Sequence, residues 1–283
     1  MNVTVNMLPG DEAHTQTGKG HAAPATTEVV TPSFPPRVFD PADAWCRGCQ
    51  SKNMSSAGEK NGFHLLRCDA CKTVITNPYP TDAELTAFYS QYHMSGSYLG
   101  KGAAKLRRGL SRVKRMKRQK PPGKKFLDIG CSVGFVVEAA QSVGLEAYGI
   151  DIDPAAIDVA RKLQNPACHF EAIALQDLAR RDGATFDMVY LSEVIEHVRD
   201  PEDFIANIAA IMKPGAIVYI TAPDAGHFRT PDPITTWNMV YPPEHLTYFT
   251  RQGITTLLAR HGLSVFRFQL AFKPGMKVFA RKA

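Results

Sequence analysis

The spacing of apolar and polar positions divides residues 126–283 into short apolar runs separated by helical patterns. Apolar runs of about four to eight residues are typical of buried strands, and apolar positions that recur every three or four residues indicate helices. The strands predicted in this way are residues 126–129, 146–150, about 168–173, 186–191 and 216–222. Because helical patterns fill the intervals, we expect a parallel sheet covered by helices on both faces.

Two further apolar runs lie at the end of the chain. Residues 263–270 and 277–280 are separated by Lys273-Pro-Gly275, which is a turn sequence. This pattern predicts a closing hairpin, so the last strand is expected to run antiparallel. The fold class predicted for residues 123–283 is therefore α/β, with a mostly parallel sheet of seven strands.

A basic amphipathic helix is predicted ahead of this sheet. Twelve of the 33 lysines and arginines fall within residues 101–125, and no acid does. Leu106, Leu110, Val113 and Met116 recur every three or four residues within this block, which indicates one apolar helix face. Two interpretations stay open: a solvated helix face, or a surface for a phosphate-bearing partner such as a nucleotide sugar, lipid-linked glycan, anionic membrane or RNA.

Residues 1 to about 40 are rich in Thr, Pro, Ala and Gly and show no periodicity, so we expect disorder there, with a short docked arm as the alternative. No apolar run approaches the roughly 18 residues of a membrane span. The first residues are polar and acidic where a secretory signal would be basic and then apolar. A soluble cytoplasmic protein is expected.

Paired cysteines predict a metal site in residues 41–78. Cys46-x-x-Cys49 and Cys68-x-x-Cys71 each place two thiols on a tight turn. Together they can complete a tetrahedral shell of four sulfurs, the arrangement of structural zinc ribbons. A closed shell leaves no position for water, so this zinc is expected to be structural. Reduced thiols that serve only as packing residues are the alternative.

Residues 79–122 are expected to form a helical linker or lid that ends in the basic helix. Thr81 is predicted to cap a helix, with Glu84 completing a capping box. The apolar positions of residues 85–92 follow at helical spacing.

The most specific chemical motif is the glycine turn after the first strand of the sheet. Asp128 precedes Gly130-Cys-Ser-Val-Gly134, and a second strand ends in Asp151, about 20 residues further on. Such a strand, turn, helix and strand unit lets the backbone approach a nucleoside, and the second acid can accept hydrogen bonds from ribose hydroxyls. The turn therefore predicts a nucleoside-cofactor site.

The charge of this turn favours one cofactor. Dinucleotide sites use Gly-x-Gly-x-x-Gly and bind a pyrophosphate at a helix N-terminus. Here the spacing is Gly130-x-Ser132-x-Gly134, and the carboxylate of Asp128 would repel a pyrophosphate. S-adenosylmethionine carries an ammonium and a sulfonium and no phosphate, so it suits the site better than NAD.

Five segments of the chain resemble the class I S-adenosylmethionine-dependent methyltransferases. More narrowly, they resemble the small-molecule branch that includes ubiquinone-pathway O-methyltransferases and sugar methyltransferases. The segments, in order, are residues 127–134, 149–154, 186–198, 212–215 and 244–250. The resemblance covers about residues 124–283 and implies a Rossmann-like methyltransferase fold in residues 123–283, with an antiparallel last strand, behind a small zinc ribbon.

Strand ends and the resemblance together identify the expected cofactor residues, because ligands of such sheets bind at the carboxyl ends of the strands. The expected set is Asp128, Gly130, Cys131, Ser132, Gly134, Asp151, Ile152, Ala174, Leu175, Leu191, Ser192, Glu193 and Tyr92. The chain lacks the Gly-Asp pair usual after the third strand, and Asp177 is a candidate helix cap there. In the sugar branch an N-terminal tyrosine segment folds over the cofactor, which implies Tyr89, Tyr92 or Tyr98; aromatic packing is the alternative.

Candidate catalytic residues lie in two places. The connection of residues 224–250 is long for a compact domain and holds aromatic and titratable groups, so a substrate pocket is expected there. His245 is the expected general base, with Glu244 or Tyr241 orienting it. His197 lies four residues after Glu193, so a shared helical face near the cofactor is expected, and a purely structural histidine is the alternative.

The function predicted is methyl transfer from S-adenosylmethionine to a small molecule, most simply O-methylation of a sugar (nucleotide-linked or glycan) or a secondary-metabolite hydroxyl. A keto-sugar acceptor would instead allow C-methylation, although the chain ends without the large C-terminal domain of sugar C-methyltransferases. Two other interpretations stay open. One is a ribosomal-RNA methyltransferase that uses the ribbon and basic helix, against which stands the missing Asn/Asp-Pro-Pro-Tyr motif. The other is a non-catalytic cofactor-binding scaffold.

Overall fold

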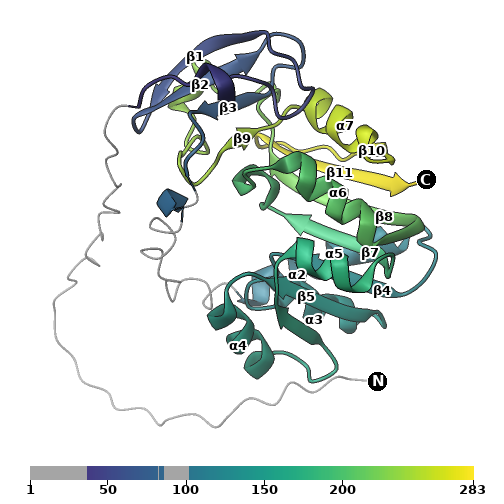
Figure 1. Cartoon of the computed structure of the whole chain (residues 1–283). Coiled ribbons are helices and arrows are strands. Elements are labelled where there is room, and N and C mark those ends of the chain that lie inside the picture. Colours follow the sequence, from purple (N-terminus) through teal and green to yellow (C-terminus); the bar gives the residue numbers. More distant parts are fainter. Residues whose placement is uncertain (1–36, 82, 86–101) are drawn as a thin grey trace, which may run out of the picture. The chain divides into compact units, whose positions relative to one another are not determined.

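The computed structural model of the chain, shown in Figure 1, describes residues 37–81, 83–85 and 102–283. Almost all of the segment expected to be disordered, residues 1–40, lies outside this part. Tyr89, Tyr92 and Tyr98 also lie outside the described residues, so their expected place over the cofactor stays a prediction.

A seven-stranded sheet forms the centre of residues 123–283. Its strands are β4 (Lys125–Ile129), β5 (Glu146–Asp151), β6 (His169–Ala172), β7 (Phe186–Ser192), β8 (Met212–Pro223), β10 (Leu263–Phe268) and β11 (Gly275–Lys282). Their order is β10-β11-β8-β7-β4-β5-β6. The pairs among β4 to β8 are parallel, and β11 runs antiparallel to both β8 and β10. The mostly parallel sheet with an antiparallel last strand is thereby confirmed.

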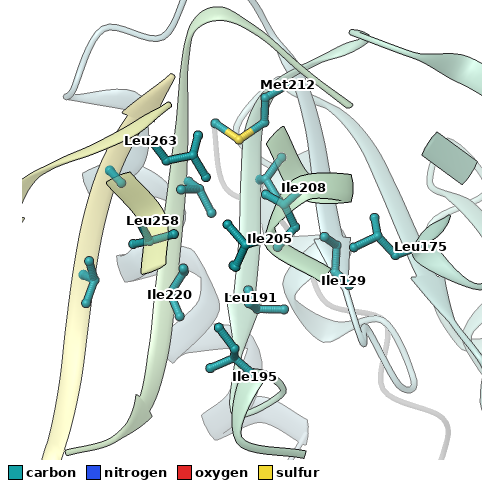
Figure 2. Close-up of a cluster of buried hydrophobic side chains, with 14 of the residues drawn as sticks. Ile129, Leu175, Leu191, Ile195, Ile205, Ile208, Met212, Ile220, Leu258 and Leu263 are labelled. Atoms are coloured by element: carbon teal, nitrogen blue, oxygen red, sulfur yellow. The ribbon is translucent and has the colours of Figure 1, made fainter. Parts of the chain in front are cut away.

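Helices cover both faces of the sheet, as the strand and helix alternation predicts. They are α2 (Gly102–Lys117), α3 (Phe135–Gln141), α4 (Pro154–Leu163), α5 (Leu175–Asp182), α6 (Pro201–Ile211) and α7 (Arg251–Arg260). One buried cluster joins the sheet to α5, α6 and α7, and Figure 2 shows part of it. A second cluster joins the opposite face to α2, α3 and α4.

Strand β7 shows why the sequence forms two clusters. Val189 and Leu191 belong to the first cluster, whereas Met188 and Tyr190 belong to the second. Successive side chains of a strand point to opposite faces, so a continuous apolar run fills two cores at once. Full burial of each such side chain stabilises the fold by about 1.5–3 kcal/mol relative to exposure.

Helix α2 confirms the predicted amphipathic pattern. Val113 and Met116 are fully buried, Leu106 and Leu110 are half-buried, and most of its basic side chains are exposed. Gly109 lies close to Val136 and Ala139 of α3, where a Cβ atom would be 3.2 Å from the Val136 side chain. The helix therefore packs tightly on α3 and directs its arginines along the sheet.

Local capping explains where several helices begin. Asp153 accepts the Ala155 N–H before α4, and the Thr250 hydroxyl accepts the Gly253 N–H before α7. Thr81 and Glu84 form the predicted capping box, with the Thr81 N–H donating to the Glu84 carboxylate at 2.7 Å. Asp177 does not cap α5, because the N-cap residue is Ala174.

Residues 41–78, which contain Cys46, Cys49, Cys68 and Cys71 and which we name the cysteine segment, form a smaller antiparallel sheet. Its strands are β1 (Met54–Lys60), β2 (Phe63–Cys68) and β3 (Val74–Asn77), and its fourth strand is β9 (Thr247–Tyr248) from the 224–250 connection. Leu65, Val74, Trp237 and Tyr248 pack together in a buried cluster. The segment and the connection therefore share both a sheet and a core.

Short 3-10 helices occur at η1 (Pro41–Asp43), η3 (Ile195–His197) and η4 (Ile234–Thr236). Within the part of the chain that the structure describes, no helix combines the length and apolar character needed to cross a membrane.

Candidate active site

The glycine turn between β4 and α3 is held in an unusual backbone conformation. Gly130, Ser132 and Gly134 have φ angles of +71°, +49° and +83°. Glycine adopts this left-handed region without steric cost, whereas other residues rarely do. A Cβ atom on Gly130 would lie 2.7 Å from the Val194 side chain, and one on Gly134 would lie 2.6 Å from the Phe170 ring. The backbone conformation and the lack of space for a Cβ atom therefore require glycine at Gly130 and Gly134.

The N–H groups of this turn are used inside the protein. Those of Gly130 and Cys131 donate to the Ile150 carbonyl at 2.9 and 3.0 Å. The Ser132 N–H donates to the Asp151 carboxylate at 2.8 Å, and the Gly134 N–H donates to a carbonyl within the turn. A pyrophosphate site needs such donors to face the ligand. The turn thus offers few donors to a phosphate.

An enclosed acid lies beneath the turn. Asp128 is 4% exposed at the end of β4. Burial raises the pKa of its carboxyl well above the ordinary value, the neighbouring Asp151 raises it further, and Arg112 opposes the shift. A carboxyl in such a place gains most from a cationic ligand, because an opposite charge stabilises the carboxylate.

These groups line a cavity of about 270 Å³, which we name the turn cavity. Six of the expected cofactor residues line it: Asp128, Gly130, Cys131, Ser132, Ser192 and Glu193. Side chains from α2 and α3 line its other side, among them Lys105, Arg108, Arg112 and Phe135.

The remaining expected cofactor residues within the described part do not line this cavity. Gly134 is the N-cap residue of α3, Ala174 is the N-cap residue of α5, and Leu175 and Leu191 are core side chains. Asp151 anchors the turn by accepting the N–H groups of Ser132 and Asp153. Ile152, which follows it, is 80% exposed.

Arg112 is a site residue that the sequence patterns did not identify. Its guanidinium donates to the hydroxyls of Tyr190 and of Ser192, the latter at 3.0 Å. Arg112 lies next to the buried Val113 in the sequence and outside the apolar positions of the helix, as a solvated arginine would. Only the packing of α2 on the sheet brings it to the end of β7.

A chain of hydroxyls connects Arg112 to Glu193. Ser192 accepts from Arg112 and contacts the Thr221 hydroxyl at 2.8 Å, and Thr221 donates to the Glu193 carboxylate at 2.7 Å. Because the Thr221 proton goes to Glu193, the Ser192 hydroxyl must donate to Thr221. This chain fixes the orientation of the Glu193 carboxylate.

The expected helical face shared by Glu193 and His197 is wrong. Strand β7 ends at Ser192, Glu193 has a φ angle of +55°, and only residues 195–197 form a short 3-10 helix. A non-glycine residue with positive φ stores local strain, which is common at functional sites. This bend turns the Glu193 side chain toward the end of the sheet.

Glu193 and Arg112 also line a second cavity, of about 360 Å³, which we name the hairpin cavity. Its other walls are Thr221–Pro223 at the end of β8, Met239, residues 271–274 of the β10–β11 connection and residues 275–277 at the start of β11. Phe272 in this wall is 80% exposed. A ligand in the turn cavity and a second ligand in the hairpin cavity would therefore meet at Glu193.

Three titratable groups from η3 and the 224–250 connection lie close together. Atoms of Glu196, His197 and His245 lie within 4.8 Å of one another. Glu196 is completely buried, and its carboxyl oxygens have no hydrogen-bond partner among the described residues. Burial and then Glu193 raise the pKa of Glu196 well above its ordinary value.

The two histidines have defined tautomers. Nδ1 of His197 lies 2.8 Å from the Glu244 carbonyl, and Nδ1 of His245 lies 2.7 Å from the Met239 carbonyl. A carbonyl only accepts, so both Nδ1 atoms carry the proton. Burial lowers the pKa of His197 to about 4 and also lowers that of His245, so both rings are neutral at pH 7.

The expected orienting side chains do not contact the His245 ring. The partner of its Nδ1 is the Met239 carbonyl, whereas Glu244 offers its own carbonyl to His197. The backbone N–H of Tyr241 donates to the Tyr248 hydroxyl at 3.1 Å. His245, Glu244 and Tyr241 line neither the turn cavity nor the hairpin cavity, and their expected catalytic roles stay predictions.

The expected pocket of aromatic residues in the 224–250 connection is wrong for most of its members. Trp237 and Tyr248 are buried against the cysteine segment, and Phe249 lies in the main core. His227 is buried and contacts the Ala271 carbonyl through Nε2 at 3.0 Å. Phe228, which is 80% exposed, and Tyr241, which is half-buried, are the exceptions. Packing against the cysteine segment, rather than substrate binding, accounts for the apolar content of this connection.

The four paired cysteines come together as predicted. Their sulfurs lie within 4.8 Å of one another, with Cys46 and Cys71 at 3.4 Å and Cys49 and Cys68 at 3.5 Å. The Cys46 sulfur also accepts the N–H groups of Gly48 and Cys49, which is the geometry of a metal knuckle. Four sulfurs that are each about 2.3 Å from a zinc ion would lie about 3.8 Å apart, so a slight expansion would accommodate the metal.

The other two cysteines are buried thiols. Burial raises the pKa of Cys131 above its ordinary value, and that of Cys168 to about 12. Both therefore stay protonated at neutral pH, as packing residues do.

Together, the sheet order, the glycine turn and the cavity at the carboxyl ends of the strands define a Rossmann-like class I methyltransferase fold. A family model described as a methyltransferase domain matches residues 98–267, more than half of the chain. The chain therefore belongs to this methyltransferase family.

Curated relatives match a shorter part. A ubiquinone biosynthesis O-methyltransferase of Burkholderia orbicola is 37% identical over 102 residues, which cover 35% of this chain and 44% of that protein. One from Burkholderia thailandensis is 37% identical over 103 residues with the same coverage. The chain thus spans 44% of the length of these relatives.

Two solved structures resemble the fold over a larger part. The 1,6-didemethyltoxoflavin-N1-methyltransferase of Burkholderia thailandensis, with 1,6-didemethyltoxoflavin and S-adenosylhomocysteine bound, has a TM-score of 0.54 at 17% identity and covers 78% of this chain and 96% of that one. An S-adenosylmethionine-dependent methyltransferase of Mesorhizobium loti has a TM-score of 0.50 at 16% identity, covering 60% and 96%. At such identities the likeness concerns the fold alone.

Proposed function

We propose that the chain transfers a methyl group from S-adenosylmethionine to an oxygen of a small molecule. The acceptor proposed is a sugar hydroxyl, nucleotide-linked or in a glycan, or a comparable secondary-metabolite hydroxyl. The observation that carries the proposal is the contact between two cavities at Glu193, one of which contains the buried acid and the glycine turn. The curated relatives named for O-methylation in ubiquinone biosynthesis support a small acceptor.

The turn cavity fits the methyl donor in charge. The donor carries an ammonium, a sulfonium and a carboxylate. Asp128 would accept the ammonium, and Arg112 would bind the carboxylate. The internal use of the turn N–H groups explains why a phosphate-free nucleoside suits the turn better than a dinucleotide. Ile152, exposed directly after Asp151, would cover the adenine.

When bound, the donor supplies an electrophilic methyl group on sulfur. The protein must hold a nucleophilic oxygen in line with that methyl and exclude water. The hairpin cavity offers the acceptor a polar end at Glu193 and an apolar wall at Phe272. In this arrangement Glu193 accepts the proton of the acceptor hydroxyl as the oxygen attacks.

His245 is a second candidate for the general base, and its tautomer favours it. Nδ1 carries the proton, so the Nε2 lone pair is available at neutral pH. The Met239 carbonyl accepts the hydrogen bond from His245 Nδ1, and Met239 lines the hairpin cavity. Substitution of each residue in turn separates the two candidates.

The proposed function is tested by donor turnover to S-adenosylhomocysteine against a panel of nucleotide sugars and hydroxylated aromatic compounds. Once an acceptor is found, Glu193→Gln is expected to lower kcat by about 10²–10⁴-fold with donor affinity retained, since general base catalysis contributes about that much. Glu146→Gln, an exposed site at the far end of β5, is the control. If Glu193→Gln keeps full turnover while His245→Ala loses it, the base is His245.

We further propose that the four paired cysteines bind a structural zinc ion. The sulfur donor set and its knuckle hydrogen bonds suit zinc, and a full shell of protein ligands leaves no position for substrate. Metal analysis of the purified chain is expected to give about one zinc per molecule. A metal-free protein with an unchanged melting temperature would contradict this assignment.

A further inference from the structure

A third cavity lies on the face of the sheet that α2 covers, and we name it the basic cavity. Its volume is about 350 Å³. Its lining residues are Arg108, Ser111, Arg112, Arg115, Tyr219 and Lys277. Four of these carry a positive charge, and no acid is among them.

The hydroxyl of Tyr219 is the most informative group in this cavity. Tyr219 is 1% exposed, and its hydroxyl has no hydrogen-bond partner among the described residues. The ring cannot easily turn away, because it is stacked on Tyr190 with centroids 5.6 Å apart and packs on Phe279 at 4.7 Å. A buried hydroxyl without a partner costs roughly 1–3 kcal/mol, so its retention indicates a ligand that completes the bond.

Three of the four charges around Tyr219 likewise have no ion-pair partner among the described residues. Arg108, Arg115 and Lys277 form no ion pair with a described residue, and the Arg115 guanidinium donates to the neutral Gln269 side chain at 3.4 Å. Burial and then the arginines of α2 lower the pKa of Lys277. Like charges gathered around one space repel each other, and an anion in that space would relieve the repulsion.

We propose that the basic cavity binds a phosphate or diphosphate group of the methyl acceptor. A phosphate presents several acceptor oxygens, which suit the planar donor groups of arginine, the Lys277 ammonium and the Tyr219 hydroxyl. The methyl donor has no phosphate to place there. The proposal rests on the proposed function and narrows its acceptor to a phosphorylated or nucleotide-linked compound.

The arrangement of the three cavities supports this assignment. Arg112 lines all three, and Lys277 lines both the basic and the hairpin cavity. An acceptor with its phosphate beside Lys277 could therefore extend through the hairpin cavity to Glu193. A nucleic acid or a membrane surface would instead be expected to use the exposed face of α2, where Lys114 is located.

Calorimetry of the full chain with sodium pyrophosphate, at fixed ionic strength in chloride, tests the proposal. Lys277→Ala combined with Arg115→Ala should weaken binding by at least ~10-fold, because each lost bond to a charged group costs about that factor. Tyr219→Phe, which removes one oxygen atom, should weaken binding about three- to tenfold. Lys114→Ala, an exposed site on the same helix, should leave it within about twofold. S-adenosylhomocysteine affinity should stay unchanged in all variants and also reports that they are folded.

Three outcomes would overturn the assignment. The first is wild-type protein that binds pyrophosphate no better than chloride. The second is equal weakening by Lys114→Ala and by the double variant. The third is an RNA oligonucleotide that binds more tightly than pyrophosphate and depends equally on Lys114, which would assign the helix to nucleic acid. Failure of S-adenosylhomocysteine to bind the wild type would instead remove the proposed function and leave the anion site standing.

Discussion

Replacing Asp128 by Asn tests the charge argument for the methyl donor most directly. The side chain is buried at the end of β4 and lines the turn cavity. Asparagine has nearly the same shape, so packing is preserved. The amide carries no negative charge, however, and it can turn a donor toward the ligand ammonium. Asp128→Asn therefore removes the proposed electrostatic contact and little else.

The magnitude follows from the burial of this group. A hydrogen bond to a charged group contributes about 1.5–3 kcal/mol, and its loss from an enclosed site corresponds to a roughly 10- to 150-fold weaker Kd. The effect should also depend on pH. The pKa of Asp128 is raised in the free protein, so at any pH below that pKa the carboxyl must lose a proton before it can pair with the ammonium. Affinity should therefore rise with pH through that pKa and fall below it.

The assay is calorimetric titration with S-adenosylhomocysteine, which keeps the ammonium and is chemically stable. Proton release on binding is measured by repeating the titration in two buffers of different ionisation enthalpy. Asp128→Asn should abolish the release and flatten the pH dependence. Asp153→Asn is the matched control, because Asp153 caps α4 outside the cavity and asparagine caps equally well.

Two results would refute the reasoning. An Asp128→Asn affinity within about twofold of the wild type would show that the carboxylate makes no contact with the ammonium. Tight binding of NAD by the wild type, with no binding of S-adenosylhomocysteine, would show that the turn accepts a dinucleotide after all.

The remaining predictions concern stability. Gly134→Ala should lower the free energy of unfolding in urea by roughly 2–5 kcal/mol, because the left-handed backbone costs about 1–2 kcal/mol and overpacking against Phe170 about 1–3 kcal/mol. Gly144→Ala, at φ +80° with nothing within 4 Å, should show the backbone cost alone. Equal costs in the two variants would contradict the clash with Phe170. Thr250→Val should cost about 2–4 kcal/mol by removing both the helix cap and the bond to the Cys71 carbonyl at 2.6 Å, whereas Thr256→Val, in the middle of α7, should stay within about 1 kcal/mol. Cys49→Ser should lower the zinc content and the melting temperature together, and a chelator should mimic it in the wild type; a full zinc content in the variant would exclude Cys49 as a ligand.

Much of the fold could be predicted because its signals are local. The two-residue period of strands, the apolar face of α2 and the Thr81 capping box each depend on neighbours in sequence. The glycine turn was equally readable, since positive φ at Gly130 and Gly134 requires that residue type. Cysteine spacing fixed the sulfur cluster in the same way.

The features that escaped prediction depend on contacts distant in sequence. Arg112 reaches Ser192 only because α2 packs across the sheet, and nothing in its own neighbourhood distinguishes it from the exposed bases of the same helix. From the sequence, Trp237 and Tyr248 are expected in a substrate pocket, because their packing against the cysteine segment depends on contacts distant in sequence. The bend at Glu193 interrupts an apparent helical pattern, because the strand before it continues to Ser192.

The pairing of β9 with β3 sets a limit on how this enzyme fold can be trimmed or recombined. The family match begins at residue 98 and leaves the cysteine segment out. Yet the Thr76 N–H donates to the Leu246 carbonyl, and the Tyr79 hydroxyl contacts the Thr247 hydroxyl at 2.6 Å. Both contacts are made to the two residues that directly follow His245. A chimera that exchanges the cysteine segment without residues 224–250 would therefore lose the β3–β9 pairing and the shared core, so the unit to transplant is discontinuous in sequence.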